Sequence, residues 1–110
     1  MNKVILVGNV GQEPETNETG NGTVTKFSVA TSKKYKGEEK TSWHNIVTFN
    51  KLSDLCSQYV KKGMKVAIDG TLSYSTWQDS EGNTKYKTEI IANEVQFLTK
   101  VEASEPAGII

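Results

Sequence analysis

The chain has 110 residues and no net charge, because 13 basic residues balance 13 acidic ones, and it contains one cysteine and one histidine. A chain of this length fits one domain that buries roughly two-thirds of the surface its unfolded form exposes, and a lone cysteine excludes an internal disulfide. No apolar run approaches the roughly 20 residues of a membrane span, and the apolar stretch near the N-terminus is too short for a secretion signal, so we expect a soluble cytoplasmic protein.

The first part of the chain predicts two strands separated by a loop. Residues 3–10, KVILVGNV, form a short apolar run bounded by glycine, which is typical of a strand. Residues 12–23 are polar and rich in turn-forming residues, so we expect a loop. Residues 24–31 alternate between the two faces of a half-buried second strand. The positions expected to share one face of it are Thr25, Phe27 and Val29.

The middle of the chain predicts a third strand and the only helix. Residues 32–40 are highly charged and are expected to form a loop, whereas residues 42–49 are rich in β-branched and aromatic residues and suit a strand. The period then changes from two to 3.6, which predicts a short helix within residues 50–63. Asn50 suits its N-cap and Gly63 its C′ position. The residues expected on its apolar face are Leu52, Leu55, Cys56 and Tyr59.

The last part of the chain predicts a hairpin. Residues 65–77 resume period two, residues 78–84 form a turn-rich tip, and residues 85–100 supply the returning strand. The positions of the first strand expected on one face are Val66, Ile68 and Leu72. Residues 101–110 show no period and are expected to form a short flexible C-terminal tail.

Three strands, a helix and two strands form the element order of an OB-fold. We therefore predict an all-β domain over residues 1–100: a five-stranded Greek-key barrel with one short helix between strands 3 and 4. Barrels of this kind commonly bind oligonucleotides or oligosaccharides, but the fold alone does not establish a function.

The charge is unevenly distributed along the neutral chain. Residues 1–25 carry a net charge of −2, residues 26–65 carry +6 and residues 66–110 carry −4. Every basic residue is lysine, which meets a phosphate as a point charge, so anion binding here is expected to be nonspecific and sensitive to salt. Charge alone favours a nucleic-acid surface and an ordinary solvated lysine-rich face about equally.

Catalytic chemistry has few candidate residues in this sequence. His44 is expected on a strand and Cys56 on a helix face, where a small core residue is the simpler interpretation than a nucleophile. One histidine and one cysteine cannot build a structural zinc site, and Gly8 and Gly11 form no phosphate-binding motif. We therefore expect that the protein is not an enzyme and that it binds no metal and no cofactor.

Aromatic residues provide the remaining constellation. On a strand, Trp43 and Phe49 point to the same side as Asn45 and Val47, and neither side is cleanly apolar, so parity leaves a core role and a surface role equally open. Trp77 is expected near the outer end of the last hairpin, with Tyr86 across from it.

Lysines lie close to these aromatic residues along the chain. A single strand of nucleic acid exposes a charged backbone and bare base faces, and aromatic platforms beside cations bind both features. This pattern predicts a surface for single-stranded nucleic acid. Its members are Lys33, Lys34, Tyr35, Lys36, Trp43, Phe49, Lys51, Trp77, Lys85, Tyr86 and Lys87.

The sequence closely resembles the bacterial and phage single-stranded DNA-binding proteins of replication. The resemblance covers about residues 1–99, with NKVILVGNVGQEPE, FSVATS, WHNIVTFNKLSDLCSQYVKKG, VAIDGTL and YKTEIIANEVQFL in the family's order and spacing. It implies an OB-fold homotetramer that wraps single-stranded DNA without sequence preference or cofactor. It also implies roles in replication, recombination and repair, in a bacterial cytoplasm or, for a phage protein, in that of the host.

The resemblance implies roles for particular residues. Trp43, Phe49 and Trp77 are similar in position to the family's base-stacking aromatics, and Tyr35 falls where relatives often have a further tryptophan. Two lysines, Lys51 and Lys62, resemble its phosphate contacts, and His44 resembles a histidine that supports subunit contacts.

The sequence departs from the family in two places. Some relatives carry basic residues where this chain has Ser75 and Thr76. Relatives also continue into a long linker with an acidic tip that recruits replication and repair enzymes, whereas only nine residues, EASEPAGII, follow Val101 here. Recruitment of such partners through the tail is therefore weakly supported.

Two other functions remain open at the level of sequence. The same barrel could serve as a protein-interaction module, such as a primosome accessory subunit, which would bind DNA weakly and a protein partner tightly. RNA is the other alternative, because a base presents the same flat face in both polymers.

Overall fold

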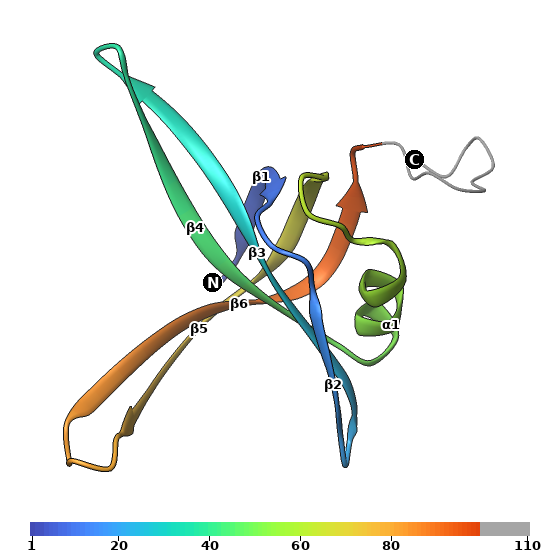
Figure 1. Ribbon diagram of the computed structural model, residues 1–110, viewed down its shortest axis with the longest axis vertical. Helices are drawn as coiled ribbons and strands as arrows, with labels where there is room; N and C mark the ends of the chain where they lie inside the picture. The colour runs from blue at the N-terminus through green and yellow to red at the C-terminus, as the bar shows by residue number, and fades with distance from the viewer. Residues whose placement is uncertain (100–110) are drawn as a thin grey trace.

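A computed structural model describes residues 1–99, which form six strands and one helix (Figure 1). The predicted tail over residues 101–110 lies outside the described residues. The elements in chain order are β1 (Val4–Val10), β2 (Glu15–Thr19), β3 (Gly22–Tyr35), β4 (Glu38–Phe49), α1 (Asn50–Tyr59), β5 (Lys65–Gln78) and β6 (Thr84–Phe97).

Five of the strands close into a barrel. The sheet order is β1-β5-β6-β4-β3-β2, and a further pairing joins β1, at one end of the sheet, to β3, the strand next to the other end. β1 pairs with β5 from Val4 to Asn9 and then with β3 at Asn9 and Val10, so one strand bridges both sides of the gap. β2 pairs with the first part of β3, from Gly22 to Lys26, and is not one of the five barrel strands. The barrel strands therefore follow the order three strands, helix, two strands, and the predicted OB-fold is confirmed.

The core lies inside the barrel and under α1. The alternation predicted for the second strand is confirmed, because Thr25, Phe27 and Val29 are all buried. Their neighbours Ile46 and Ile68 are fully buried in the same cluster. Inward residues of neighbouring strands thus pack together, which leaves the alternate positions of each strand on the outside.

Two segments predicted as loops are strands. Residues 12–23 contain β2 and the start of β3, and residues 32–40 form the end of a hairpin in which β3 and β4 pair as far as Tyr35 and Glu38. Its turn needs only two residues, Lys36 and Gly37, both with positive φ, as in the tight turns that suit twisted hairpins. These strands have both faces in water, so their sequence carries no alternation of apolar and polar residues.

The helix is confirmed but its predicted ends are wrong. Asn50 is the first helical residue, with a φ of 57°, and no side chain caps the N-terminus. The helix ends at Tyr59, so Gly63 lies beyond it in a turn. No helix in residues 1–99 is long and apolar enough to cross a membrane.

The buried face of the helix also differs from the prediction. Cys56 is buried as expected, but Ser53 takes the second buried position and Leu55 and Tyr59 are partly exposed. Ser53 fits because its hydroxyl shares a 2.7 Å hydrogen bond with the hydroxyl of Thr25 on β3, which satisfies both buried groups.

Gly70 provides a test of the packing between β5 and β6. It lies at an irregularity in the pairing of the two strands, and a β-carbon there would collide with the carbonyl oxygen of Ile91. We expect Gly70→Ala to destabilise the fold by about 1 to 3 kcal/mol, as overpacking typically does, when unfolding is followed in denaturant. Gly20→Ala is the matched control, because a β-carbon at Gly20 meets nothing within 4 Å. Equal stability of the two variants would contradict this packing.

Candidate nucleic-acid interface

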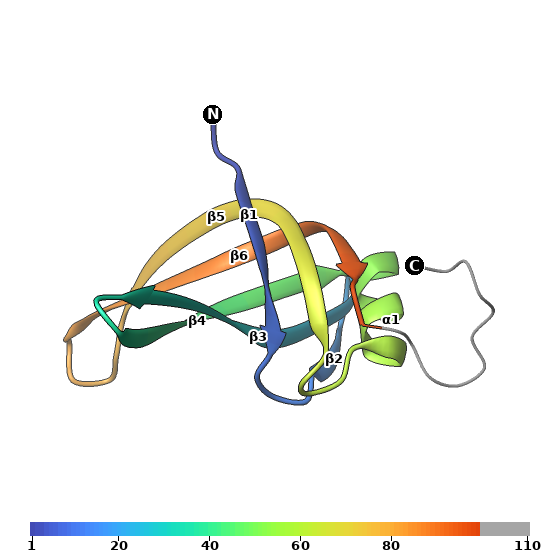
Figure 2. The same ribbon diagram turned by 90° about the horizontal axis from the view of Figure 1, so that it is seen from above.

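Two long hairpins extend from the barrel as arms on the side away from α1 (Figures 1 and 2). The first arm consists of the ends of β3 and β4, and the second of the ends of β5 and β6. Each arm is a two-stranded ribbon, so one of its faces continues the outside of the barrel and the other continues the inside. We call the first the outward face and the second the inward face.

Trp43 lies on the outward face of β4. Its side chain is 61% exposed, and it pairs across the ladder with Ala30 of β3. Gly11 lies beneath its ring, and a β-carbon at Gly11 would overlap the six-membered ring of Trp43. The indole therefore rests on a glycine backbone with its other surface open to solvent, and Trp43 is not a core residue.

Phe49 shares the outward face with Trp43 and is 44% exposed. Between them, Val47 is buried although it points to the same side. Val47 sits in the middle of the sheet, with Lys26 of β3 on one side and Ile91 of β6 on the other. The mixed burial of this face explains why parity left the role of the two aromatics open.

Trp77 also lies on the outward face, on the second arm, and is 48% exposed. It pairs with Lys85, so the prediction that Tyr86 lies across from it is wrong by one residue. One residue of register reverses the face. Tyr86 therefore lies on the inward face, where its ring stacks on Tyr74 with centroids 5.9 Å apart.

A tight turn fixes the tip of the second arm. The carboxylate of Asp79 accepts hydrogen bonds from the backbone N–H groups of Asn83 and Glu81, both at 2.9 Å. The bond from Asn83 is the main reason that the pKa of Asp79 is lowered. The Nζ of Lys85 lies 3.9 Å from Oδ2 of the same carboxylate.

Tyr35 lies on the opposite face of the first arm from Trp43. The register places Tyr35 at an odd position of β3 and pairs Trp43 with Ala30 at an even one, so the two rings point to opposite sides. Tyr35 is 60% exposed, and the ammonium group of Lys36 is 5.5 Å from the centre of its ring. Lys33 shares the face of Tyr35 and pairs with Lys40, an unfavourable like-charge pair in the absence of an anion.

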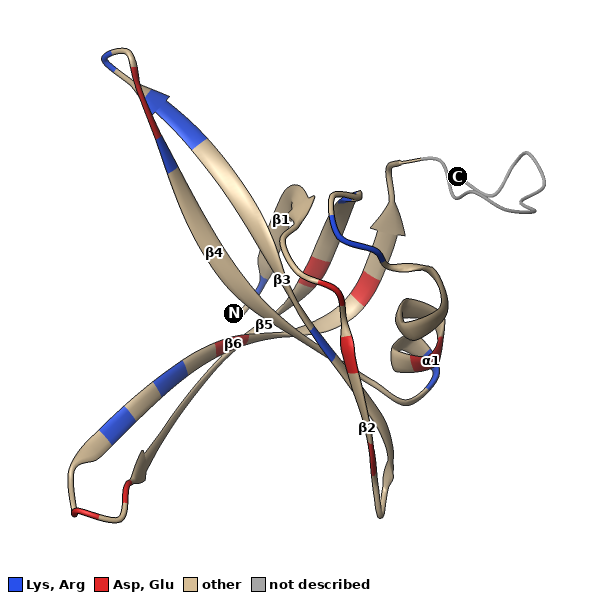
Figure 3. Cartoon of the chain, in the orientation of Figure 1, with Lys and Arg blue, Asp and Glu red and all other residues tan. Residues whose placement is uncertain are grey.

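The remaining predicted residues are spread over the molecule. Lys34 is on the outward face of the first arm opposite Glu39, and Lys51 is the second residue of α1. Lys62 follows the helix, and its backbone N–H donates to the carboxylate of Glu13. Figure 3 shows lysines along both arms and acidic residues at the tip of the second.

His44 is half-buried on the side of β4 opposite to Trp43. Its Nε2 shares a 2.9 Å hydrogen bond with the hydroxyl of Thr31. The structure therefore places His44 and the outward aromatics on opposite sides of β4. The predicted subunit contact of His44 would not use the face that carries Trp43.

Sequence reasoning missed two residues of this surface. Gly11 was interpreted only as the end of a strand, and nothing in the sequence indicates that a ring rests on it. Lys26 was passed over although the alternation of β3 already places it outward, next to Val47. The signal for Lys26 was therefore present in the sequence.

The described part of the chain offers little to catalysis or metal binding. Residues 1–99 contain no group of three or more metal-ligating side chains. Burial raises the pKa of the Cys56 thiol to about 11, against a smaller opposing effect of its hydrogen bond with Thr48. A thiol that stays protonated is a poor nucleophile.

Comparisons with known proteins place the chain in a family. A family model described as the single-strand binding protein family matches residues 1–98. Single-stranded DNA-binding protein 1 of Chlorobaculum tepidum is 45% identical over 89% of this chain and 65% of its own length. A protein of the same name from Xylella fastidiosa is 38% identical over 98% of this chain and 85% of its own length.

A solved structure shares the architecture. The Plasmodium falciparum SSB in complex with ssDNA superposes with a TM-score of 0.83 and 33% identity, over 89% of this chain and 95% of that one. The chain spans only about two-thirds of the Chlorobaculum protein and 60% of a Xanthomonas campestris relative. Because the family model covers nearly the whole of residues 1–99 and the fold agrees, the chain belongs to the single-strand binding protein family.

Proposed function

We propose that this protein binds single-stranded DNA without sequence preference and acts by binding alone, without catalysis. The observation that carries the proposal is the position of Trp43, Phe49 and Trp77, three partly exposed rings on one continuous outward face. Unpaired bases lie on these rings, and nearby lysines contact the phosphates. The names of the relatives support DNA as the ligand.

Stacking supplies the larger share of the affinity in this neutral chain. A base stacked on an aromatic side chain contributes about 1 to 3 kcal/mol, so three platforms outweigh the modest attraction of a few lysines. Every base has a flat face, and no arginine fork is available to read base edges, because all basic residues are lysine. Both features favour tolerance of sequence.

Lysines on the arms and beside α1 contact the phosphates of the DNA backbone. Lys85 and Lys87 lie beside Trp77 on the second arm, and Lys34 lies on the outward face of the first. Lys51 and Lys62 contribute at the two ends of α1.

Tyr35 offers a fourth platform, with Lys33 and Lys36 beside it. Because this platform is on the other face of the first arm, a strand that reaches both Trp43 and Tyr35 must pass around the edge of the hairpin. The path proposed for the DNA is therefore a wrap around the arm.

The assembly that we propose is a homotetramer with His44 near a subunit contact. Ile5 and Val7 on β1 are exposed, and residues Val4 to Gly8 pair on one edge only, so an apolar strand edge is open to another chain. We place the tetramer in the cytoplasm, in DNA replication, recombination and repair. Replication and repair enzymes are its protein partners, without a firm role for residues 101–110.

Oligonucleotide titration tests DNA binding directly. Addition of oligo(dT) at low salt should quench the emission of Trp43 and Trp77, because stacking brings a base onto each ring. The affinity should fall as salt rises, with a log-log slope of about −0.7 for each phosphate neutralised. Matched RNA oligomers are the comparison. Absence of quenching at low salt, or preference for RNA, would contradict the proposal.

Removal of one platform should weaken binding without unfolding the domain. We expect Trp43→Ala to lose about 1 to 3 kcal/mol of binding free energy, measured by the same titration on the remaining Trp77. Its stability in denaturant should stay within about 1 kcal/mol of the parent, as for most exposed positions. Tyr59→Ala is the control, because it also replaces an aromatic side chain with a methyl group. Tyr59 lies at the end of α1, away from the outward face. Loss of cooperative unfolding in Trp43→Ala would show that the ring is structural.

Mass in solution tests the assembly. Light scattering should give four chains of 12.1 kDa each, and His44→Ala should shift the mass toward smaller species at micromolar concentration. A monomer in the parent protein would rule out the tetramer, and an unchanged mass in the variant would remove His44 from the contact.

A further inference from the structure

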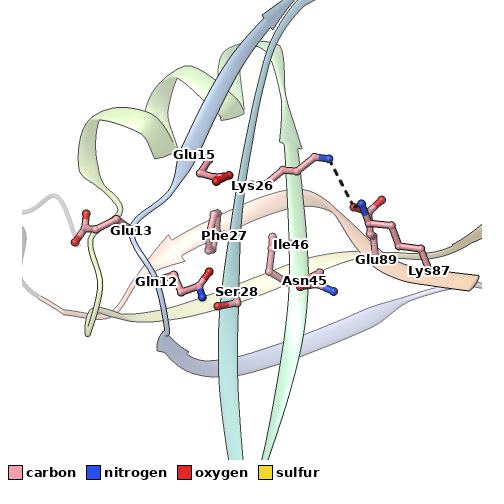
Figure 4. Close-up of a pocket in the computed structure, with 10 residues that line it drawn as sticks. All are labelled: Gln12, Glu13, Glu15, Lys26, Phe27, Ser28, Asn45, Ile46, Lys87 and Glu89. Carbon is pink, nitrogen blue, oxygen red and sulfur yellow. Dashed lines mark ion pairs between the residues drawn. The ribbon is translucent and has the colours of Figure 1, made fainter.

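An open groove of about 220 Å³ lies on the outward face between the platforms of the two arms (Figure 4). Its lining includes Lys26 and Ser28 of β3, Asn45 of β4, and Lys87 and Glu89 of β6. Two further carboxylates, Glu13 and Glu15, also line it, and Glu15 pairs with Lys26 across the ladder. The register fixes where it lies relative to the aromatic residues. Asn45 is two residues from Trp43 on the same face of β4, and Lys87 is two residues from Lys85, which pairs with Trp77. A strand that runs from Trp43 to Trp77 therefore crosses this groove.

One carboxylate holds the two cations of the groove. The Nζ of Lys87 is 3.1 Å from Oε2 of Glu89, and the Nζ of Lys26 is 4.0 Å from the same oxygen. The side chain of Glu89 is only 19% exposed, whereas both lysines reach into solvent. Figure 4 shows the ammonium group of Lys26 directed across the groove toward Glu89. Glu89 thus occupies the position in which an anionic ligand would meet both lysines.

We propose that the groove is a binding site for the DNA backbone, in which a phosphodiester displaces the Glu89 carboxylate from Lys26 and Lys87. The inference rests on the proposed function and extends it in two respects. It adds Lys26 as a phosphate contact, and it makes Glu89 an internal competitor that lowers the affinity of the groove. No bond is made or broken in the exchange: each ammonium group passes from a carboxylate oxygen to a phosphate oxygen.

The competition follows from elementary electrostatics. A lysine ammonium binds a carboxylate and a phosphate in the same way, as a point charge with several donors. When a phosphate enters, Glu89 remains close to it, and the two negative charges repel each other in a partly buried groove where screening is weaker than in bulk water. The lysines of the groove therefore contribute less to binding than exposed, unpaired lysines would.

The opposite role for Glu89 makes the opposite prediction. If Glu89 served only to orient Lys26 and Lys87 toward the ligand, removal of its charge would leave both side chains without a fixed conformation, and binding would weaken. If the groove were not on the path of the DNA, removal of the charge would change nothing beyond the effect of one unit of net charge. The sign of the change therefore separates the three cases.

Glu89→Gln is the deciding variant, because it removes the charge and nearly preserves the shape. We expect oligo(dT) to bind about 3- to 10-fold more tightly at low salt, the range set by two ion pairs of modest strength. We also expect the log-log salt slope to steepen by up to about 0.7, since the freed lysines would then neutralise a phosphate without leaving an unpaired carboxylate. Unchanged or weaker binding would overturn the proposal.

Glu94→Gln is the matched control. Glu94 is on the same strand and carries the same charge, but it accepts a hydrogen bond from Gln96 and does not line the groove. Its affinity should stay within about twofold of the parent protein. Equal gains in both variants would reduce the effect to net charge and overturn the assignment of the groove.

Lys26→Gln tests the same site from the cationic side, independently of how Glu89→Gln folds. We expect binding to weaken by about 2- to 5-fold, with a salt slope that is shallower by up to about 0.7. An unchanged affinity and slope would exclude Lys26 as a phosphate contact. Tryptophan quenching in the parent protein and in Glu94→Gln reports on the proposed function separately, so a failure of the groove cannot be confused with a failure of DNA binding.

Discussion

Closure of the barrel is the constraint on which the functional surface depends. β1 pairs first with β5 and then with β3, and this double pairing gives the sheet a single inside and a single outside. Ile46 and Thr48 of β4 are then confined to the core, and Trp43 and Phe49 to the exterior. A large aromatic ring gains little by facing water, and two of them fixed on the outside of a well-packed barrel support the proposal that bases stack there.

The arms extend this distinction beyond the barrel. Past the core, both faces of each hairpin are in solvent, yet the register still keeps the two sets of side chains apart. The outward face carries Trp77 with Lys85, and the inward face carries Tyr35 on one arm and the stacked Tyr74 and Tyr86 on the other. One ribbon therefore offers two separate surfaces. In the proposed binding mode, DNA on the outward face leaves the stacked Tyr74 and Tyr86 exposed on the inward face.

The elements that build the core were predictable from the sequence, because burial on one face leaves a period. Thr25, Phe27 and Val29 showed it, and the change to a helical period at Asn50 marked α1. The second arm was predicted as a hairpin and is confirmed, because residues 65–77 resume a period of two. The end of the first arm, residues 32–40, was not predictable as strand, since residues with both faces in water carry no such period. The pairing of Trp77 with Lys85 was missed by one residue, because the tip turn sets the register and its hydrogen bonds to Asp79 depend on three-dimensional geometry.

The candidate site could be proposed from its residue types, but the arrangement of those residues could not be predicted. The sequence proposes Trp43 as a candidate platform and Lys87 as a candidate cation, but the choice between core and surface for Trp43 needed the position of Val47 in the sheet. The support of the indole by Gly11 joins residues 32 positions apart, and no local pattern reports such a contact. Glu89 was invisible as part of the site, because an acid near lysines in sequence is ordinary surface charge.

Pairing of lysines within the protein changes how charge and stacking share the work. Lys26 and Lys87 each face Glu89, and Lys85 faces Asp79, so much of the cationic charge on and beside the second arm is already balanced before a ligand arrives. A phosphate gains from such a lysine only the difference between two similar contacts, and salt reduces that difference further. Stacking on Trp43 and Trp77 is much less sensitive to salt. At physiological ionic strength the rings therefore provide most of the proposed affinity, and the paired lysines mainly guide the backbone along its path.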